Sequence, residues 1–232
     1  MLARRPTSRI LAAARKLGYR PIEALAELQS DGIPIVDLDV SGFWLHLTWQ
    51  ASSQRNPEKS LTWDREQGFR IGVEHLVELG HTSIAILRSV AQGARTTGVK
   101  LAGYKLGLQD AGIGYDEALV QDVPGDSFEH GYEGFKKLIE RRPDVTAVMC
   151  MDDPVAVGVI AAARDLGLET PANISVTGYG ARTGWRLVPP KLTTIAARAT
   201  PVVEKVVDYM MAMREEHDIG AEPVSEPMVL IL

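Results

Sequence analysis

The chain has 232 residues, enough for one large or two modest domains, and its 45% hydrophobic and 24% charged content is close to the average of globular proteins. A formal net charge of −5 excludes a protein whose whole surface attracts nucleic acid. The single cysteine, Cys150, excludes an intrachain disulfide and a thiolate metal cluster, and no apolar run approaches the ~20 residues that span a membrane, so we expect a cytoplasmic protein.

The first twenty residues form a basic segment, because all their charged side chains are basic and the first acid is Glu23. A basic start on an acidic body is typical of an arm that contacts DNA, and Arg4, Arg5 and Arg9 are the candidate contacts. A solvated amphipathic helix over 7–17 is an equally good interpretation. No hydrophobic segment follows these charges, so we expect no secretory signal.

The elements of the first quarter of the chain are short. Apolar spacing predicts a helix over 22–29 and a strand over 33–38. Aromatic residues over 43–49 suggest β structure before a polar loop at 52–57, and a further strand is expected near 60–63.

The remaining chain alternates strands with helices over short connections. This order is the pattern of a parallel α/β sheet. Helices are expected at 65–79, 102–111, 129–141, 154–166 and 202–213, and strands at 84–87, 119–123, 147–151, 174–177 and 228–232.

Polar residues follow two of the expected strands directly. Asp152 and Asp153 come after the strand at 147–151, and Tyr179 follows the strand at 174–177. In an open parallel sheet, side chains at the carboxyl ends of strands face the ligand crevice, so these residues are the first candidates for contacting a small molecule. The alternative for the two acids is a helix cap, because Pro154 follows them.

These landmarks, in this order, resemble the effector-binding core of the lactose-repressor/galactose-repressor (LacI/GalR) transcription factors. Each motif alone is weak, but the ordered set over residues 60 to 200 is specific. The N-terminal stretch 12–21 also resembles the third headpiece helix and the start of the hinge. The matching core segments are 72–81 followed by 84–87, Lys100-Leu101-Ala102-Gly103-Tyr104, Gly125-Asp126-Ser127-Phe128 with Gly131-Tyr132, Asp152-Asp153-Pro154-Val155-Ala156-Val157-Gly158, 174–179 and 189–195.

The resemblance implies an α/β fold with two lobes, each built on a parallel sheet as in periplasmic binding proteins. The chain departs from the family in two ways. Only about six residues precede the headpiece-like helix, where the family has its helix-turn-helix, and the first strands of the N-terminal lobe are missing. We therefore expect a remnant headpiece and hinge at 1–26, an incomplete N-terminal lobe at 27–88 plus 198–224, and an effector-binding lobe at 89–197 plus 225–232.

The resemblance also assigns effector-binding residues. Lys100 stands where the family usually has arginine, and Gly180 stands where it commonly has aspartate. The alternative for Asp64 is a cap on the helix at 65–79, which we favour, and for Phe128 a core position, also favoured. The implied effector contacts are Asp153, Lys100, Tyr179, Phe128, Asp64, Asp152 and Trp185.

The function implied by the resemblance is that of a non-enzymatic, ligand-sensing transcriptional regulator. Its partners would be a small polar effector, often a sugar in the family, and a second copy in a homodimer. Without a recognition helix we expect autonomous DNA binding to be impaired or absent, since basic residues alone supply only phosphate contacts. The alternative is a solute-binding protein of the ribose-binding type, which shares the two-lobed fold.

The sequence does not support a cofactor, metal or enzymatic site. His75 and His81 are six residues apart and span a helix end, so they do not share a face as metal ligands at i and i+4 would. The glycine-rich segments lack the spacings of nucleotide-binding loops, and no nucleophile–histidine–acid motif occurs. We therefore expect neither a cofactor nor catalysis.

Overall fold

A computed structural model describes residues 36–39, 46–49, 60–92, 94–181, 190–197, 204, 207, 208 and 224–232. The chain divides into two compact units. The first comprises residues 1–40, 45–61 and 203–224, and the second comprises 41–44, 62–202 and 225–232.

The second unit contains a six-stranded sheet with strand order β10-β8-β7-β6-β4-β5. Neighbouring strands from β5 to β8 are parallel, and β10 joins the edge antiparallel to β8. All four residues of β6 are buried, as expected for a central strand covered on both faces. The strands are β4 (Ile84–Ser89), β5 (Val120–Val123), β6 (Ala147–Cys150), β7 (Ser175–Tyr179), β8 (Thr193–Ala197) and β10 (Met228–Ile231).

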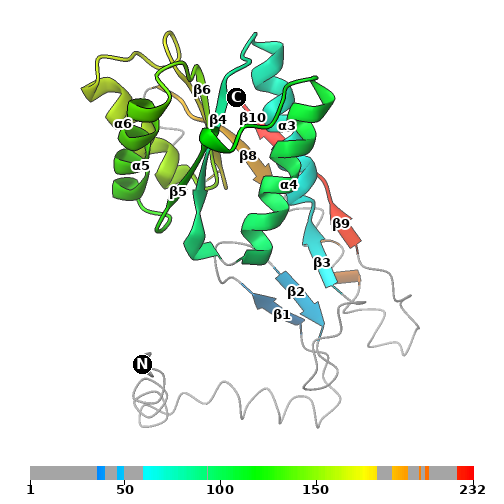
Figure 1. Ribbon diagram of the computed structural model, residues 1–232. Coiled ribbons are helices and arrows are strands. Elements are labelled where there is room, and N and C mark those ends of the chain that lie inside the picture. The colour runs from blue at the N-terminus through cyan, green and yellow to red at the C-terminus, as the bar shows by residue number, and fades with distance from the viewer. Residues whose placement is uncertain are drawn as a thin grey trace, which may run out of the picture. The chain divides into compact units, whose positions relative to one another are not determined.

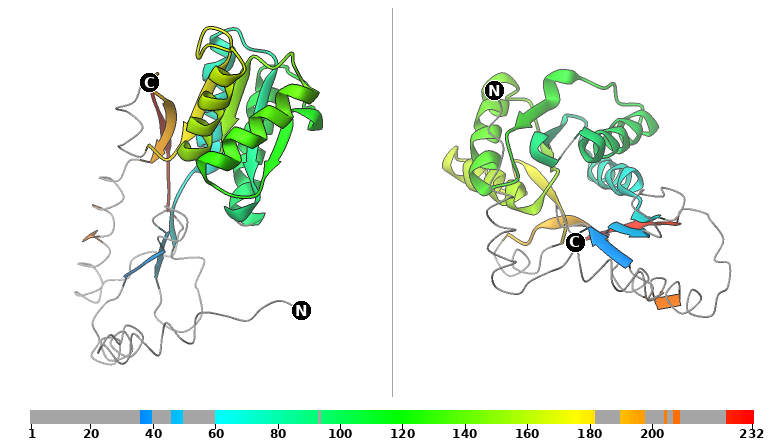
Figure 2. Two further views of the ribbon diagram at one scale, coloured as in Figure 1. Left: turned by 90° about the vertical axis from the view of Figure 1, so that its left-hand side faces the viewer. Right: turned by 90° about the horizontal axis from the view of Figure 1, so that it is seen from below.

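Two pairs of helices cover this sheet, α3 with α4 on one face and α5 with α6 on the other (Figures 1 and 2). Glycines let each pair approach closely, because a Cβ at Gly103 would collide with the backbone of Glu66, and one at Gly131 with the backbone of Val155. The helices are α3 (Arg65–Glu78), α4 (Ala94–Asp110), α5 (Phe128–Arg141) and α6 (Asp153–Asp165). Short 3-10 turns, η2 (Val90–Gln92) and η3 (Glu117–Leu119), precede α4 and β5.

The core between the sheet and the α5–α6 pair is apolar. Phe135, Leu138 and Val159 are fully buried there, together with the thiol of Cys150. Burial raises the pKa of Cys150 well above its usual value, so this thiol is an inert core group.

The first unit contributes to a second, four-stranded sheet with strand order β1-β2-β3-β9. We expected parallel sheets in both lobes, but β1 pairs antiparallel with β2, and β2 antiparallel with β3. Strands that follow one another over connections too short for a crossover helix can only pair in this way. The strands are β1 (Val36–Asp39), β2 (His46–Trp49), β3 (Ser60–Trp63) and β9 (Val224–Glu226).

The structure departs from the sequence expectations in three further ways. Helix α4 begins at Ala94, whereas the helix was expected at 102–111. Strands β8 and β9 were not predicted, because Thr193–Ala197 follow two prolines that indicate a turn and Val224–Glu226 end a polar stretch. Residues 65–88 were assigned to the N-terminal lobe, but the structure places α3 and β4 in the second unit, since β4 pairs with both β5 and β6. The other lobe boundaries stay predictions.

The helices predicted at 7–17 and 22–29 lie outside the described residues, as does most of 202–213. Among the helices that the structure does describe, none is both long and apolar enough to cross a membrane.

Candidate functional site

The carboxyl ends of the central strands carry a cluster of buried polar side chains. Because parallel strands end at the same edge of a sheet, the residues after β4, β6 and β7 are brought together there. Lys100, Asp152 and Asp153 are 0%, 3% and 1% exposed. Charged groups are almost never buried this deeply unless they are paired or functional, so we call this group, with Tyr179, the strand-end cluster.

Lys100 reaches the cluster from the first half of α4. Its Nζ donates hydrogen bonds to Gln92 Oε1 at 2.6 Å and to the carbonyl oxygen of Met151 at 2.8 Å. The same nitrogen lies 3.9 Å from the centre of the Tyr179 ring, within the range of a cation–π interaction. The lysine is thus held by loop, strand end and ring together.

Burial lowers the pKa of Lys100 to about 7, since an ammonium loses its hydration inside the protein. The carboxylates of Asp152, Asp126 and Asp153 oppose this shift, and the guanidinium of Arg65 adds to it. Burial thus favours the neutral amine of Lys100, whereas an arginine at this position would keep its charge.

Asp152 and Asp153 form the start of α6. Asp152 is the N-cap residue but makes no side-chain capping hydrogen bond, and Asp153 is the first helical residue. Asp153 Oδ1 instead accepts a 2.6 Å hydrogen bond from the hydroxyl of Thr194 on β8. The helix dipole favours negative charge at this end, so fold and candidate site use the same residues.

Tyr179 ends β7 and is fully buried. Its ring packs against Phe69 of α3 with centroids 5.3 Å apart, and its hydroxyl donates to Met228 Sδ at 3.5 Å. Burial raises the pKa of Tyr179, while the charge of Arg65 and a hydrogen bond with it act in the opposite direction. The ring is a fixed wall of the cluster rather than a group that ionises.

Three polar residues of this region were missed by sequence reasoning: Gln92, Asp126 and Arg65. Gln92 closes the turn after β4, and its Nε2 donates to Asp126 Oδ1 at 3.0 Å and to the carbonyl oxygen of Met151 at 3.2 Å. The signal that could have found Gln92 and Asp126 is the strand-end rule that identified Asp152, because each follows a strand within three residues. Arg65 has no such signal, since it begins a helix.

Of the other predicted site residues, two lie at the starts of helices and the rest lie outside the described residues. Asp64 caps α3 by accepting from the backbone N–H of Gln67 at 2.8 Å, as the favoured alternative predicted. Phe128 is 39% exposed at the start of α5, stacked on Tyr132, so the core position favoured for it is wrong. Trp185, Arg4, Arg5 and Arg9 lie outside the described residues.

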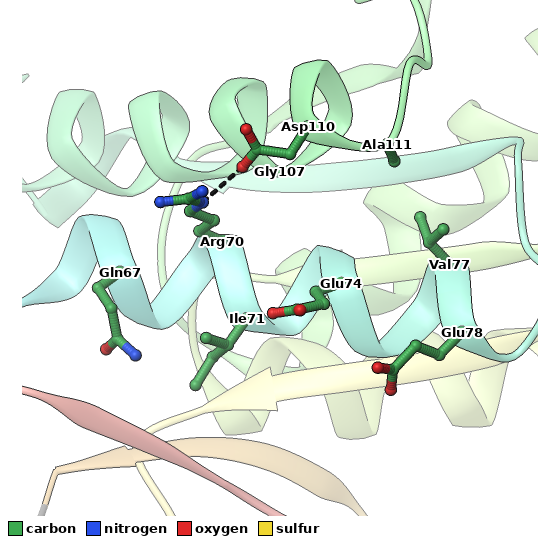
Figure 3. A pocket seen from close by; sticks show the side chains of 9 residues that line it. All are labelled: Gln67, Arg70, Ile71, Glu74, Val77, Glu78, Gly107, Asp110 and Ala111. Atoms are coloured by element: carbon green, nitrogen blue, oxygen red, sulfur yellow. Dashed lines mark hydrogen bonds and ion pairs between the residues drawn. The ribbon is translucent and has the colours of Figure 1, made fainter.

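A groove of about 480 Å³ lies on the outer side of α3 and α4, and it holds none of the predicted residues (Figure 3). Arg70 and Asp110 pair across it at 2.5 Å, and both side chains are about half exposed. Exposed charges that pair in water contribute little and need no ligand to explain them. The strand-end cluster, with its buried charges, is therefore the stronger candidate site.

His81 is held by two hydroxyl groups in the described part of the chain. His81 Nδ1 and Nε2 lie 2.9 Å from the hydroxyls of Thr146 and Ser175, at the amino ends of β6 and β7. Among the described residues, no group of histidine, cysteine and acidic side chains has an arrangement that holds a metal ion.

Residues 73–232 match the family model of the periplasmic binding protein-like domain. The chain is 35% identical over 129 residues to the HTH-type transcriptional repressor PurR of Proteus mirabilis, covering 55% of this chain and 37% of the relative. It is 29% identical over 198 residues to the HTH-type transcriptional regulator DegA of Bacillus subtilis, covering 84% and 54%. The chain thus spans about half the length, or less, of these curated relatives.

A solved structure is similar in the same way. It is a sugar-binding transcriptional regulator of the LacI family from Escherichia coli, complexed with phosphate, with a TM-score of 0.69 and 26% sequence identity. The alignment covers 77% of this chain and 63% of that one. The family match covers all six strands of the sheet, since it begins in α3 and ends after β10.

Proposed function

We propose that this chain, which belongs to the periplasmic binding protein-like domain family of LacI/GalR regulators, is the effector-sensing part of a transcriptional regulator. Its effector would be a small polar molecule of the sugar type, bound at the strand-end cluster and not chemically transformed. The relatives are transcriptional regulators, which supports a binding role over an enzymatic one.

The observation that carries this proposal is the burial of Lys100, Asp152 and Asp153 around one aromatic ring at the carboxyl edge of the sheet. Carboxylates accept hydrogen bonds from hydroxyl groups, which a sugar-like molecule carries in number. The hydroxyl of Ser89, at the end of β4, is also buried without a hydrogen-bond partner among the described residues. A polar ligand or a bound water would supply that partner.

The test is a thermal-shift screen of the full chain against ribose, cellobiose, polyols, nucleosides and inorganic phosphate, followed by calorimetric titration of any stabilising compound. A ligand that binds only the folded state raises the melting temperature, by an amount that grows with the logarithm of its concentration over Kd. We expect at least one sugar-like compound to do so. A complete screen without a stabilising compound would count against the proposal.

Variants of two aspartates distinguish binding at the strand-end cluster from binding in the groove on α3 and α4. Asp153→Ala removes a carboxylate of the strand-end cluster, whereas Asp110→Asn removes the charge of a groove residue. We expect the first change to weaken binding by at least tenfold, since a hydrogen bond to a charged group contributes about 1.5–3 kcal/mol. The second should leave Kd unchanged. The reverse result would move the binding site to the groove.

Self-association and DNA contact belong to the same proposal. The family resemblance favours a homodimer in the cytoplasm, which sedimentation of the purified chain tests. The basic residues Arg4, Arg5 and Arg9 would contact phosphates without reading sequence. A gel-shift series with random-sequence DNA should then show weak binding that disappears as salt rises.

A further inference from the structure

One glutamine joins the loops at the carboxyl edge of the sheet. Gln92 donates from Nε2 to Asp126 in the loop before α5 and to the carbonyl oxygen of Met151 before α6, and its Oε1 accepts from Lys100. Lys100 donates to the same Met151 carbonyl. The loops that follow β4, β5 and β6 are therefore tied together by two side chains, which we call the Gln92–Lys100 brace.

The brace uses Lys100 in a way that keeps it from the surface. The side chain is 0% exposed, and its nitrogen lies between Gln92 Oε1, the Met151 carbonyl and the Tyr179 ring at 2.6, 2.8 and 3.9 Å. A ligand contact at this nitrogen would require these partners to be displaced. The geometry instead suits a group that holds other groups in place.

We propose that Lys100 is a positioning residue: through Gln92 and the Met151 carbonyl it sets the arrangement of the three loops, and gain or loss of one proton at Lys100 changes that arrangement in all three at once. This inference rests on the proposed effector role of the strand-end cluster, because one of these loops carries Asp152 and Asp153.

The protonation state of Lys100 affects the brace because charged groups surround its nitrogen. The charged and titratable groups that face Lys100 are Arg65 from α3, Asp126 from the loop before α5, Asp152 and Asp153 from the start of α6, and Tyr179 from β7. An ammonium has three hydrogens to donate and is attracted to the Tyr179 ring. A neutral amine has two and loses that attraction, so the brace weakens when the proton leaves. Burial has already lowered the pKa of Lys100 to about 7, which places this change near neutral pH.

The experiment follows backbone amide chemical shifts of the ¹⁵N-labelled full chain between about pH 5.5 and about pH 9, without any ligand. We expect the amides of 90–92, 126 and 151–153 to shift with one shared midpoint close to 7. Lys100→Arg should abolish this shared shift, because arginine keeps its charge throughout. Lys105→Met is the matched control, since Lys105 is exposed on the same helix, and it should leave the midpoint unchanged.

A second variant keeps the test decisive where arginine does not fit the buried position. Gln92 is only half-buried, so Gln92→Leu is expected to fold while cutting the link to Asp126. In that variant the amide of 126 should stop following the midpoint, while those of 151–153 continue. The proposal is overturned if the three loops titrate at different midpoints in the wild type, if the shared midpoint persists in Lys100→Arg, or if residue 126 still follows in Gln92→Leu. None of these outcomes depends on effector binding, so failure of the sugar screen is a separate result.

Discussion

Charged side chains are exposed at the amino ends of the strands of the six-stranded sheet and buried at their carboxyl ends; we call these two sides the amino edge and the carboxyl edge. At the amino edge, Arg142 pairs with Asp144 and Asp116, and the three side chains are 23%, 54% and 47% exposed. At the carboxyl edge, Lys100 and Asp153 are at most 1% exposed. Exposed pairs cost little to form and contribute little, whereas buried charges carry a desolvation penalty that packing alone does not require. Stability alone would therefore be served by exposed ion pairs at both edges, so the buried charges at the carboxyl edge point to another role.

The same contrast extends to hydrogen bonding. The amino edge is closed by local or strand-to-strand contacts, such as Ser83 donating to Asp144 at 3.1 Å and His81 bridging Thr146 and Ser175. The carboxyl edge depends on Gln92, which joins three loops that are far apart in sequence. The first edge therefore holds strands together, and the second arranges loops.

Replacing Lys100 by methionine is expected to give the largest loss of stability. Methionine has a similar length but cannot donate the hydrogen bonds to Gln92 Oε1 and the Met151 carbonyl oxygen, and the loss of this buried donor should lower the free energy of unfolding by about 3 kcal/mol. Urea denaturation near neutral pH measures the loss. Lys105→Met, an exposed lysine on the same helix, is the control. Equal losses in both variants would remove the distinction between the buried and exposed lysines.

The stability of the wild type should rise with pH above neutrality. The pKa of Lys100 lies at about 7 in the folded state and at its usual 10.5 when unfolded, so between these values the unfolded chain binds more protons. The desolvation penalty of the ammonium disappears as pH rises through 7, and we expect a gain of about 2 kcal/mol between about pH 7 and about pH 9. Urea titrations at both pH values measure it. A flat profile in the wild type, or an unchanged slope in Lys100→Met, would exclude Lys100 as the cause.

The sequence predicts the elements that form the two edges and some of the residues at the carboxyl edge, but it does not predict the contacts that these residues make. Periodicity and turn residues locate most of the described strands and helices, and the strand-end rule selects Asp152, Asp153 and Tyr179. These signals are local. The burial of Lys100 cannot be predicted from local sequence, because it depends on α4 beginning at Ala94 and on the first half of this helix packing over the cluster. Gln92 acquires its role only when β5 and β6 flank β4, and an isolated glutamine in a turn gives no sign of that.

A variant of His81 tests whether the hydrogen bonds at the amino edge hold neighbouring strands together. His81→Phe removes both hydrogen bonds to Thr146 and Ser175 and should cost about 1 kcal/mol, less than loss of the buried lysine. Partial burial lowers the pKa of His81. The stability that it contributes is therefore lost as pH falls below the unfolded value of 6.5, a range separate from that of Lys100. Urea midpoints at neutral and acidic pH check both points, and a loss as large as that of Lys100→Met would contradict the ranking.

Arg142 should give the smallest effect, although its contacts look the strongest. Its guanidinium donates to both oxygens of Asp144 at 2.8 Å and also to Asp116, and these bonds hold the pKa of Asp144 well below its usual value. Water and salt screen an exposed pair, so Arg142→Gln should shift the urea midpoint less than His81→Phe does. The remaining difference should vanish at about 1 M salt, where the Debye length is about 3 Å. Lys100→Met should keep its deficit under the same salt, because salt does not screen the buried hydrogen bonds that this variant loses. A loss of stability in Arg142→Gln that does not change with salt would contradict the view that the charges at the amino edge are solvent-screened and contribute little.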